Sequence, residues 1–538
     1  MTSSPPAQAS ITASPATTTP AVGHTYLDVG AVRIQTYLAR SRHLWGRRGA
    51  SAVLAEICRP DSVDDLAREL SADLPVTVRR NDEAAEVDGV VSVIIEPAAG
   101  TTTAAPDPDG LPRRVAERIA AWMSRELPGL QLEAHAAGGA DYITARRALA
   151  RMPVLEWLPA QLEYPPNELC SECGQDAAVA DIVVVDRRQR VCADCYARRT
   201  WTQRGGQGPT RHPAVVYRRM ADVGTDVGTF TVEARLLAAL GIDSAVDDFG
   251  DLASLSRRRR GNHLATIAAD GNALGAFFAA VKDRVAAPAV GAEPPRQGRE
   301  LLGSLSRDVA TTTWEALLAA TAEVFDRGGG DEFVPVTPHI SGGDDLLVSV
   351  TADRTWRFVL TLLQAFGGLT APSPLAAAAV RLGLDPPTLS AGVVISHASL
   401  PFGQQVTLSA ELLEQAKTAV SGHGFSVAWL DTTRDGSRPV EGRQPLMLTE
   451  LMTWKPGLDR LAGLPQSTLH GLRREIDTGD ARYAQQRLRS RLRRQEPAAA
   501  DAVRAFLDCA GDNLLSADWH AAECVRVLQA GLSLAMWW

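Results

Sequence analysis

The sequence predicts an α+β protein: two βαββαβ units of the ferredoxin-like type around a four-cysteine module, then a helical C-terminal domain. A strand–helix–hairpin–helix pattern occurs twice, two CxxC pairs lie between its two occurrences, and the chain reads as helical from about residue 445. We expect these divisions: a disordered leader at 1–24, a first unit at 25–165, the cysteine module at 166–210, a helical linker at 211–260, a second unit at 261–440 and the C-terminal domain at 441–538.

Each unit is read from its hydrophobic periodicity. In the first, "TYLDVGAVRIQTYLARSRHLW" is a strand running into a helix, "PVTVRRNDEAAEVDGVVSVIIEP" is a pair of strands around a turn, and "GLPRRVAERIAAWMSREL" is an amphipathic helix. In the second, "HLATIAAD" starts a similar series that continues through "TWEALLAATAEVF", "TWRFVLTLLQAF", "LSAGVVIS" and "AELLEQAKTAV". The Ser-, Thr-, Ala- and Pro-rich leader before them predicts disorder.

The cysteines predict a structural zinc site. Cys170 and Cys173 form one CxxC pair, Cys192 and Cys195 form another, and eighteen residues separate the pairs. Four thiolates at this spacing can enclose one Zn²⁺ tetrahedrally, which leaves no open position for catalysis.

Composition excludes several classes of protein. The formal net charge of −8 gives no overall field for gripping nucleic acid, so any such contact needs local basic patches. No apolar run reaches eighteen residues, and the leader lacks the basic start and hydrophobic middle of a signal peptide. We therefore expect a cytoplasmic protein without a membrane partner.

Two acidic glycine motifs compete for the role of a metal-binding turn of a palm domain. "GGDEF" at Gly329–Phe333 follows the helical "WEALLAATAEVFDRG", so its glycines are interpreted as a helix stop. "GGDD" at Gly342–Asp345 lies between "FVPVTPHI" and "LLVSV", which is the strand–turn–strand pattern that such a site needs. Pro335 and Pro338 predict that the leading strand is an edge strand.

The predicted sheet brings a third carboxylate to this hairpin. Asp270 ends "HLATIAAD", and the strand after the hairpin should pair antiparallel with it, which places Asp270 near Asp344 and Asp345. Gly271 and Gly275 would then form a loop and helix start facing phosphates. The alternative is that Asp270 only caps the following helix.

These residues resemble the large polymerase/cyclase-like subunit of type III CRISPR effector complexes, particularly the B-type. "IQTYLARSRHLWGRRGASAVLAEI" is similar to the opening of the first palm of that family, and "VCADCYARR" to its second cysteine knuckle. "AADGNALG" is similar to its DGDxMG strand end, "HISGGDDLLV" to its catalytic hairpin, and "LSAGVVISHASLPFGQQVTLSAELLEQAK" to its stretch ending in Ala-Lys.

The resemblance implies an enzyme that converts ATP into cyclic oligoadenylates in antiviral defence when target RNA is bound. It implies Mg²⁺ or Mn²⁺ as the catalytic ion, and crRNA, target RNA and other effector subunits as partners. His397 and Ser341 could line the pocket, although a lone histidine is more often structural. Asp344 and Asp345 would bind the metal with the help of Asp270, and the nucleotide would contact Gly271, Asn272, Gly275, Ser341, Gly342, Gly343 and Lys417. Lys417 could equally be a solvated helix lysine.

Three departures from the family pattern qualify that expectation. Asn272 stands where the family has the second acid of DGD, which removes a possible metal ligand. None of the ten histidines precedes an aspartate, so the His-Asp nuclease domain is expected to be missing. "DGVVSVII" stands where a first catalytic hairpin would be, so the first palm is expected to be inactive.

Two alternatives therefore stay open beside the cyclase: a nucleotide-binding scaffold subunit of an RNA-guided complex, and a stand-alone cyclic dinucleotide synthase. A basic stretch between Arg473 and Arg494, with eight arginines and three acids, is either a solvated helix face or a contact for RNA or an acidic subunit.

Overall fold

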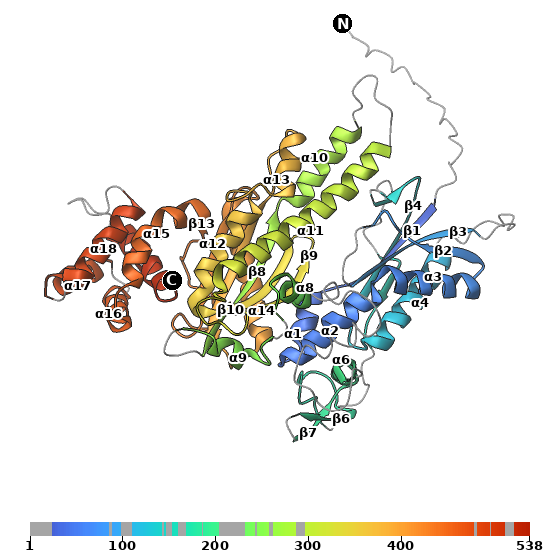
Figure 1. Cartoon of the computed structure of the whole chain (residues 1–538), viewed down its shortest axis with the longest axis horizontal. Coiled ribbons are helices and arrows are strands. Elements are labelled where there is room, and N and C mark those ends of the chain that lie inside the picture. Colours follow the sequence, from blue (N-terminus) through green and yellow to red (C-terminus); the bar gives the residue numbers. More distant parts are fainter. Residues whose placement is uncertain are drawn as a thin grey trace, which may run out of the picture.

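Two β-sheets, each with its own helices, lie side by side, with a cysteine module below the first and helices beyond the second (Figure 1). The arrangement is taken from a computed structural model that describes residues 24–84, 89–97, 110–142, 145–146, 153–159, 168–184, 187–203, 232–242, 245–257, 262–286, 296–477, 481–494, 497–511 and 521–538. The predicted leader, apart from its last residue, lies outside these residues, as does about half of the predicted linker.

The first unit has the predicted ferredoxin-like strand order, extended by one short strand. Its sheet runs β2-β3-β1-β4-β5, with every neighbouring pair antiparallel. Leu27 and Val29 of the central strand pack against the helices in a separate hydrophobic core. The elements are β1 His24–Ala31, α1 Ile34–Ala39, α2 Leu44–Ile57, α3 Pro60–Asp73, β2 Val76–Arg80, β3 Val90–Pro97, α4 Gly110–Glu126, β4 Leu132–Gly139 and β5 Leu155–Trp157.

The second unit is a six-stranded sheet in the order β13-β12-β11-β8-β10-β9. Its β11-β8-β10-β9 part is the predicted ferredoxin-like order, and β9 is the predicted edge strand. The elements are β8 His263–Asn272, α10 Leu274–Ala286, α11 Arg296–Val324, β9 Val336–Gly342, β10 Asp345–Thr351, a 3₁₀ turn Ala352–Arg354, α12 Thr355–Phe366, α13 Pro374–Arg381, β11 Thr388–His397, α14 Phe402–Val420, β12 Ser426–Asp431 and β13 Leu446–Met447.

Helices cover both faces of this second sheet because side chains alternate along each strand. Ile267 and Ala269 of β8 face the core shared with α11 and α12, whereas Leu264 and Ala268 face a second cluster with Phe402 of α14. Helix α14 links the parallel strands β11 and β12, so it crosses the face opposite α10–α13. This helix is the one that reaches the acidic end of β8.

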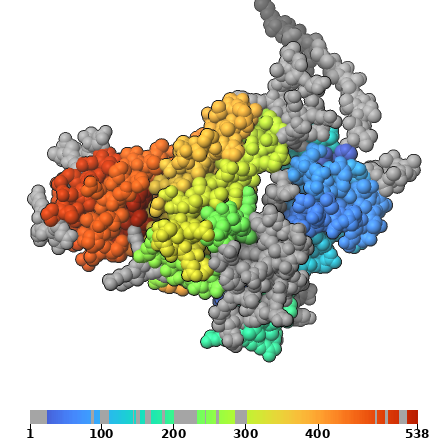
Figure 2. Space-filling view, viewed as in Figure 1, coloured from blue at the N-terminus to red at the C-terminus, as the bar shows by residue number. Residues whose placement is uncertain are grey.

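The C-terminal part is helical as predicted, except that β13 pairs with β12 before the first helix. Figure 2 shows these helices, coloured red, packed on the second unit at the end away from the first unit. They are α15 Leu448–Ala462, α16 Gln466–Ile476, α17 Ala481–Arg494, α18 Pro497–Ala510 and α19 Ala521–Ala535. Among the described helices, none is both long and apolar enough to cross a bilayer.

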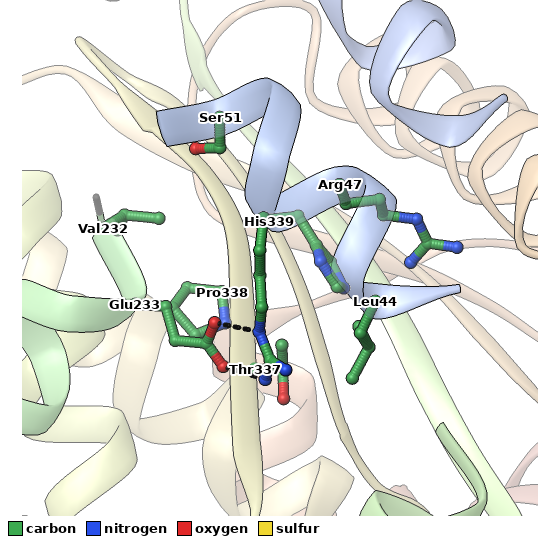
Figure 3. Close-up of a pocket in the computed structure, with 9 residues that line it drawn as sticks. Leu44, Arg47, Ser51, Val232, Glu233, Thr337, Pro338 and His339 are labelled. Carbon is green, nitrogen blue, oxygen red and sulfur yellow. Dashed lines mark hydrogen bonds and ion pairs between the residues drawn. The ribbon is translucent and has the colours of Figure 1, made fainter. Parts of the chain in front are cut away.

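The two units meet where α2 lies along the edge strand β9. Arg47 of α2 is buried and lies with its guanidinium carbon 3.2 Å from the ring centre of Phe402, at the start of α14. In Figure 3, Arg47 and Leu44 come from α2, His339 from β9, and Glu233 from helix α8 (Val232–Ala239), around one small pocket. The first unit therefore touches both elements, β9 and α14, that carry the candidate site described next.

Candidate active site

The GGDD motif forms a tight hairpin between β9 and β10. Gly342 pairs with Asp345, so the loop between them has two residues, Gly343 and Asp344. Gly343 has φ 62°, a left-handed conformation at the first loop position, as a type II′ hairpin requires. Ser341 stands just before the turn on β9, and its side chain is partly exposed.

Asp270 lies beside this hairpin, as the sequence predicts. Strand β10 pairs with β8 so that Leu346 opposes Ala269, which brings Asp345 level with Asp270. Burial, a hydrogen bond that protonated Asp344 donates to Asp270, and the Asp270 charge raise the pKa of Asp344 to about 7. Burial and the Asp270 charge raise the pKa of Asp345 to about 6, although Lys417 opposes the rise.

Lys417 reaches this carboxylate cluster from α14. Its Nζ donates to Asp270 Oδ2 in an ion pair whose two side chains are each about three-quarters buried. Helix α14 can approach the sheet closely because Gly392 of β11 has no side chain; a Cβ there would meet backbone atoms of Ser409, Leu412 and Leu413. The only sequence signal for this close approach of α14 is a glycine within a strand pattern, and the sequence prediction did not use it.

The glycines after Asp270 have different surroundings. A Cβ on Gly271 would lie 2.8 Å from Asp344 Oδ2, so the missing side chain makes room for that carboxylate. A Cβ on Gly275, in the first turn of α10, would meet nothing within 4 Å, and the residue faces open space. Ala273, with φ 56°, turns the chain between strand and helix.

Asn272 lies next to the site but its amide group is committed elsewhere. Its Nδ2 donates to Gly424 O at 2.9 Å and to Thr388 Oγ1 at 3.1 Å, and the residue is 3% exposed. Its Oδ1 is buried without a hydrogen bond from the described part of the chain. This geometry gives Asn272 the role of fixing the end of β8 and does not support the predicted nucleotide contact.

Two further expectations have a clear spatial outcome. The GGDEF segment lies in the loop after α11, where Asp331 forms two bonds with Arg354, at 2.6 and 2.8 Å. His397 ends β11 opposite His263, whereas Thr388 of the same strand opposes Asn272. His397 therefore lies at the end of β11 away from the carboxylates, which favours its structural role over the pocket role.

The acidic cluster suits a hard divalent cation in the chemistry of its donors. Carboxylate oxygens are the ligands that Mg²⁺ and Mn²⁺ take, and a cation would offset both the burial and the repulsion that raise the two pKa values. Among the described residues, only the four cysteines hold three or more ligand atoms within 4.8 Å of one another. The three carboxylates are looser, and one of them contacts Lys417 instead.

The cysteines form the compact site that their spacing predicts. Cys173 Sγ lies 3.8 Å from Cys192 Sγ, the separation of about 3.8 Å expected for two sulfurs bound tetrahedrally to one ion. Hydrogen bonding to Cys170 and to the other thiols lowers the pKa of Cys173 and raises that of Cys195. The module, with β6 Ala180–Val184, β7 Arg187–Val191 and α6 Ala193–Gln203, could therefore hold a metal such as zinc.

Comparison with known proteins agrees with this arrangement. The model of the Cas10/Cmr2 second palm domain matches residues 263–422, which contain β8, the GGDD hairpin and α14. A search of curated protein sequences gave no match.

Several solved structures share the fold. A Csm1–Csm4 cassette in complex with cA4 aligns with a TM-score of 0.52 and 15% identity, over 96% of this chain and 70% of that chain. A Csm1–Csm4 cassette in complex with one ATP gives 0.51 and 15%, over 96% and 70%. Csm1 in T.onnurineus gives 0.51 and 16%, over 96% and 69%. Residues 263–422 therefore match the second palm domain of Cas10/Cmr2, and the overall fold is shared with Csm1.

Proposed function

We propose that this chain is a metal-dependent nucleotidyltransferase that makes cyclic oligoadenylates from ATP in type III CRISPR antiviral defence. The observation that supports it best is the meeting of Asp270, Asp344, Asp345 and Lys417 at one end of the second palm sheet. The similar cassettes were solved in complex with ATP and with cA4, which agrees with this substrate and product.

Each residue has a defined task in this proposal. Asp344 and Asp345 would hold the metal with Asp270, and the bound ion would neutralise the triphosphate and activate the attacking hydroxyl. Gly342 and Gly343 place no side chains at the turn, so that a phosphate can approach the backbone. Lys417 offers a point charge to the triphosphate oxygens, and the open first turn of α10 at Gly275 offers backbone N–H groups.

We assign turnover to the second unit, residues 261–440, and a supporting role to the first unit, residues 25–165. Zinc in the cysteine module would be structural because four thiolates fill its coordination sphere. We further propose that the partners are a Csm4-like subunit, as in the similar cassettes, together with crRNA and target RNA. Arg487 and Arg491 of α17 both bond Glu475, so part of that basic surface stabilises helix packing.

An assay with labelled ATP and Mg²⁺ or Mn²⁺, with and without target RNA, tests the proposal. We expect cyclic adenylate products from the native chain and at least a 100-fold loss, roughly, in Asp344→Ala/Asp345→Ala. Glu332→Ala is the matched control, since it changes an exposed acid of the GGDEF segment and should leave the products unchanged.

A nucleotide-binding scaffold is the second candidate, and Asn272 is the observation that favours it. Its buried amide supplies no carboxylate to the site, so the cluster has one acid fewer than the DGD pattern would give. Nucleotide binding without any product, under every metal and RNA condition, would establish the scaffold and exclude both the oligoadenylate synthase and a cyclic dinucleotide synthase.

A further inference from the structure

Lys417 and Asp270 form a direct ion pair at the centre of the acidic cluster. The lysine Nζ contacts Asp270 Oδ2, and both side chains keep about a quarter of their surface exposed. An oxygen that accepts from an ammonium group has one lone pair fewer for a metal ion. The pair therefore involves a carboxylate that the proposed reaction assigns to the metal.

The backbone beneath this lysine is firmly positioned, whereas its side chain can move. Helix α14 packs on β8, β11 and β12, and its backbone lies against Gly392 with no room for a Cβ there. Lys417 lies in the last turn of α14, where the helix dipole favours a cation, and its four-carbon stem carries the charge on rotatable bonds. Its ammonium can thus change partners without any movement of the helix.

The charges around the pair favour such an exchange. Asp344 and Asp345 flank Asp270, and Lys417 acts on Asp345 as well as Asp270, so one ammonium serves two of the three carboxylates. A triphosphate arriving at the site brings more negative charge than Asp270 alone, and it competes for the same ammonium.

We propose that Lys417 is an internal cation that occupies Asp270 in the empty site and transfers to the triphosphate when nucleotide binds. The transfer frees Asp270 for the metal, so that nucleotide and metal binding assist each other through one side chain. This inference rests on the proposed function, because it assumes that the acidic cluster takes both ligands.

Binding of Mn²⁺ alone to the full chain, followed by electron paramagnetic resonance of the free ion, tests the exchange without catalysis. Lys417→Met should bind Mn²⁺ more tightly than the native chain, by about three- to tenfold. Lys455→Met is the matched control, since it removes a lysine from an exposed pair with Asp459 on α15 and should leave the affinity unchanged.

A double-mutant cycle separates direct competition for Asp270 from a general effect of charge. In an Asp270→Asn background the Lys417→Met change should alter Mn²⁺ affinity by less than about twofold, because the contested carboxylate is gone. In the reciprocal test, Asp270→Asn should tighten ATP binding in EDTA by freeing Lys417, and this gain should vanish when Lys417 is also Met.

The outcomes distinguish the inference from the proposed function. Equal Mn²⁺ affinities of the native chain and Lys417→Met would overturn the exchange, as would an undiminished effect in the Asp270→Asn background. If Mn²⁺ does not bind, or binds equally well without Asp344 and Asp345, the proposed metal site is overturned instead. Lys417→Gln, which also removes the charge but has a different shape, is a second test. It should likewise bind Mn²⁺ more tightly than the native chain.

Discussion

Asn272 lies two residues beyond Asp270 on the same face of β8, but its side chain bonds neighbouring segments of the fold and not the acidic cluster. Its amide nitrogen joins three segments, the end of β8, the start of β11 and the loop after α14. A carboxylate at this position would have no hydrogen to donate to Gly424 O, and it would be buried. The residue therefore stabilises the frame that holds Asp270.

Asn272→Asp tests this at the residue scale. We expect a loss of about 1–3 kcal/mol in the free energy of unfolding, because two donated hydrogen bonds disappear. The loss should grow as pH rises, since burial favours the protonated acid and the unfolded state ionises more readily. Chemical denaturation at pH 5 and pH 8 measures both effects.

The control is Asn262→Asp, the same change at an exposed position beside the start of β8, which should stay near native stability. A gain in Mn²⁺ affinity in Asn272→Asp, without loss of stability, would show that the position is a lost metal ligand after all.

Sequence reasoning located the carboxylates better than their surroundings. The meeting of Asp270, Asp344 and Asp345 could be predicted because strand order and hairpin position follow from local pattern, whereas Lys417 was suggested by the family resemblance alone. The partners of Asn272 lie 116 and 152 residues away, and no local pattern records them. The choice between a pocket role and a structural role for His397 depended on the direction of β11.

At the scale of elements, Gly392 determines how closely α14 lies on the sheet. Gly392→Ala would press a methyl group against backbone atoms, 3.1 Å from Leu412 C, and only a shift of the helix could relieve it. We expect about 1–3 kcal/mol of destabilisation and weaker nucleotide binding, since Lys417 moves with α14. Thermal unfolding and nucleotide titration measure the two effects.

Gly138→Ala is the control for that change, because a Cβ on this residue of β4 meets nothing within 4 Å. If Gly392→Ala keeps the stability and the nucleotide affinity of the native chain, α14 can shift away from the sheet without cost.

Edge strand β9 carries a buried histidine at the junction with α2. His339 Nε2 lies 2.9 Å from Ser349 Oγ, and its ring lies 4.7 Å from that of Phe402. Burial, together with the charges of Arg47 and Arg48, lowers the pKa of His339 well below its usual value. The folded protein therefore keeps this ring neutral under conditions in which the unfolded chain takes up a proton.

This lowered pKa predicts a loss of stability in acid. Stability is complete above the unfolded pKa of about 6.5 and falls by up to about 1.4 kcal/mol per pH unit below it. His339→Gln should have a shallower decline between pH 7.5 and 5, measured by denaturant unfolding at each pH. Identical slopes for the two proteins would mean that His339 is protonated in the fold.

The fold itself was largely predictable, because both units depend on periodic patterns in their main strands and helices, from the 5 residues of β2 to the 29 of α11. The short strand β13 was missed: its two residues carry no period, and it forms because β12 offers an open edge.

At the scale of the whole molecule, the cysteine module is hydrogen-bonded to the first unit through two buried carboxylates. Glu172, between Cys170 and Cys173, accepts from Ser41 Oγ at 2.5 Å and from the backbone N–H of His43 at 3.1 Å. Asp194 of α6 accepts from the Tyr37 hydroxyl at 2.7 Å. Zinc in the module would therefore stabilise residues outside it.

We expect one zinc ion per chain. Removal of the ion by a chelator should lower the free energy of unfolding by about 3 kcal/mol or more. Elemental analysis and thermal unfolding check these values. Cys173→Ser should reproduce the loss, whereas Cys509→Ser, outside the cluster, should retain both metal and stability. Full stability after complete removal of zinc would contradict this role.

The largest hydrophobic core runs from Leu236 to Trp537, well past both ends of the 263–422 palm match. Trp537, the penultimate residue, donates from its indole nitrogen to Asp431 at the end of β12. A gene segment encoding only the palm would thus inherit the acidic hairpin without the side chains that complete its interior. Recombination that transfers this site between relatives would therefore need to carry the whole stretch from Leu236 to Trp537 to keep that core intact.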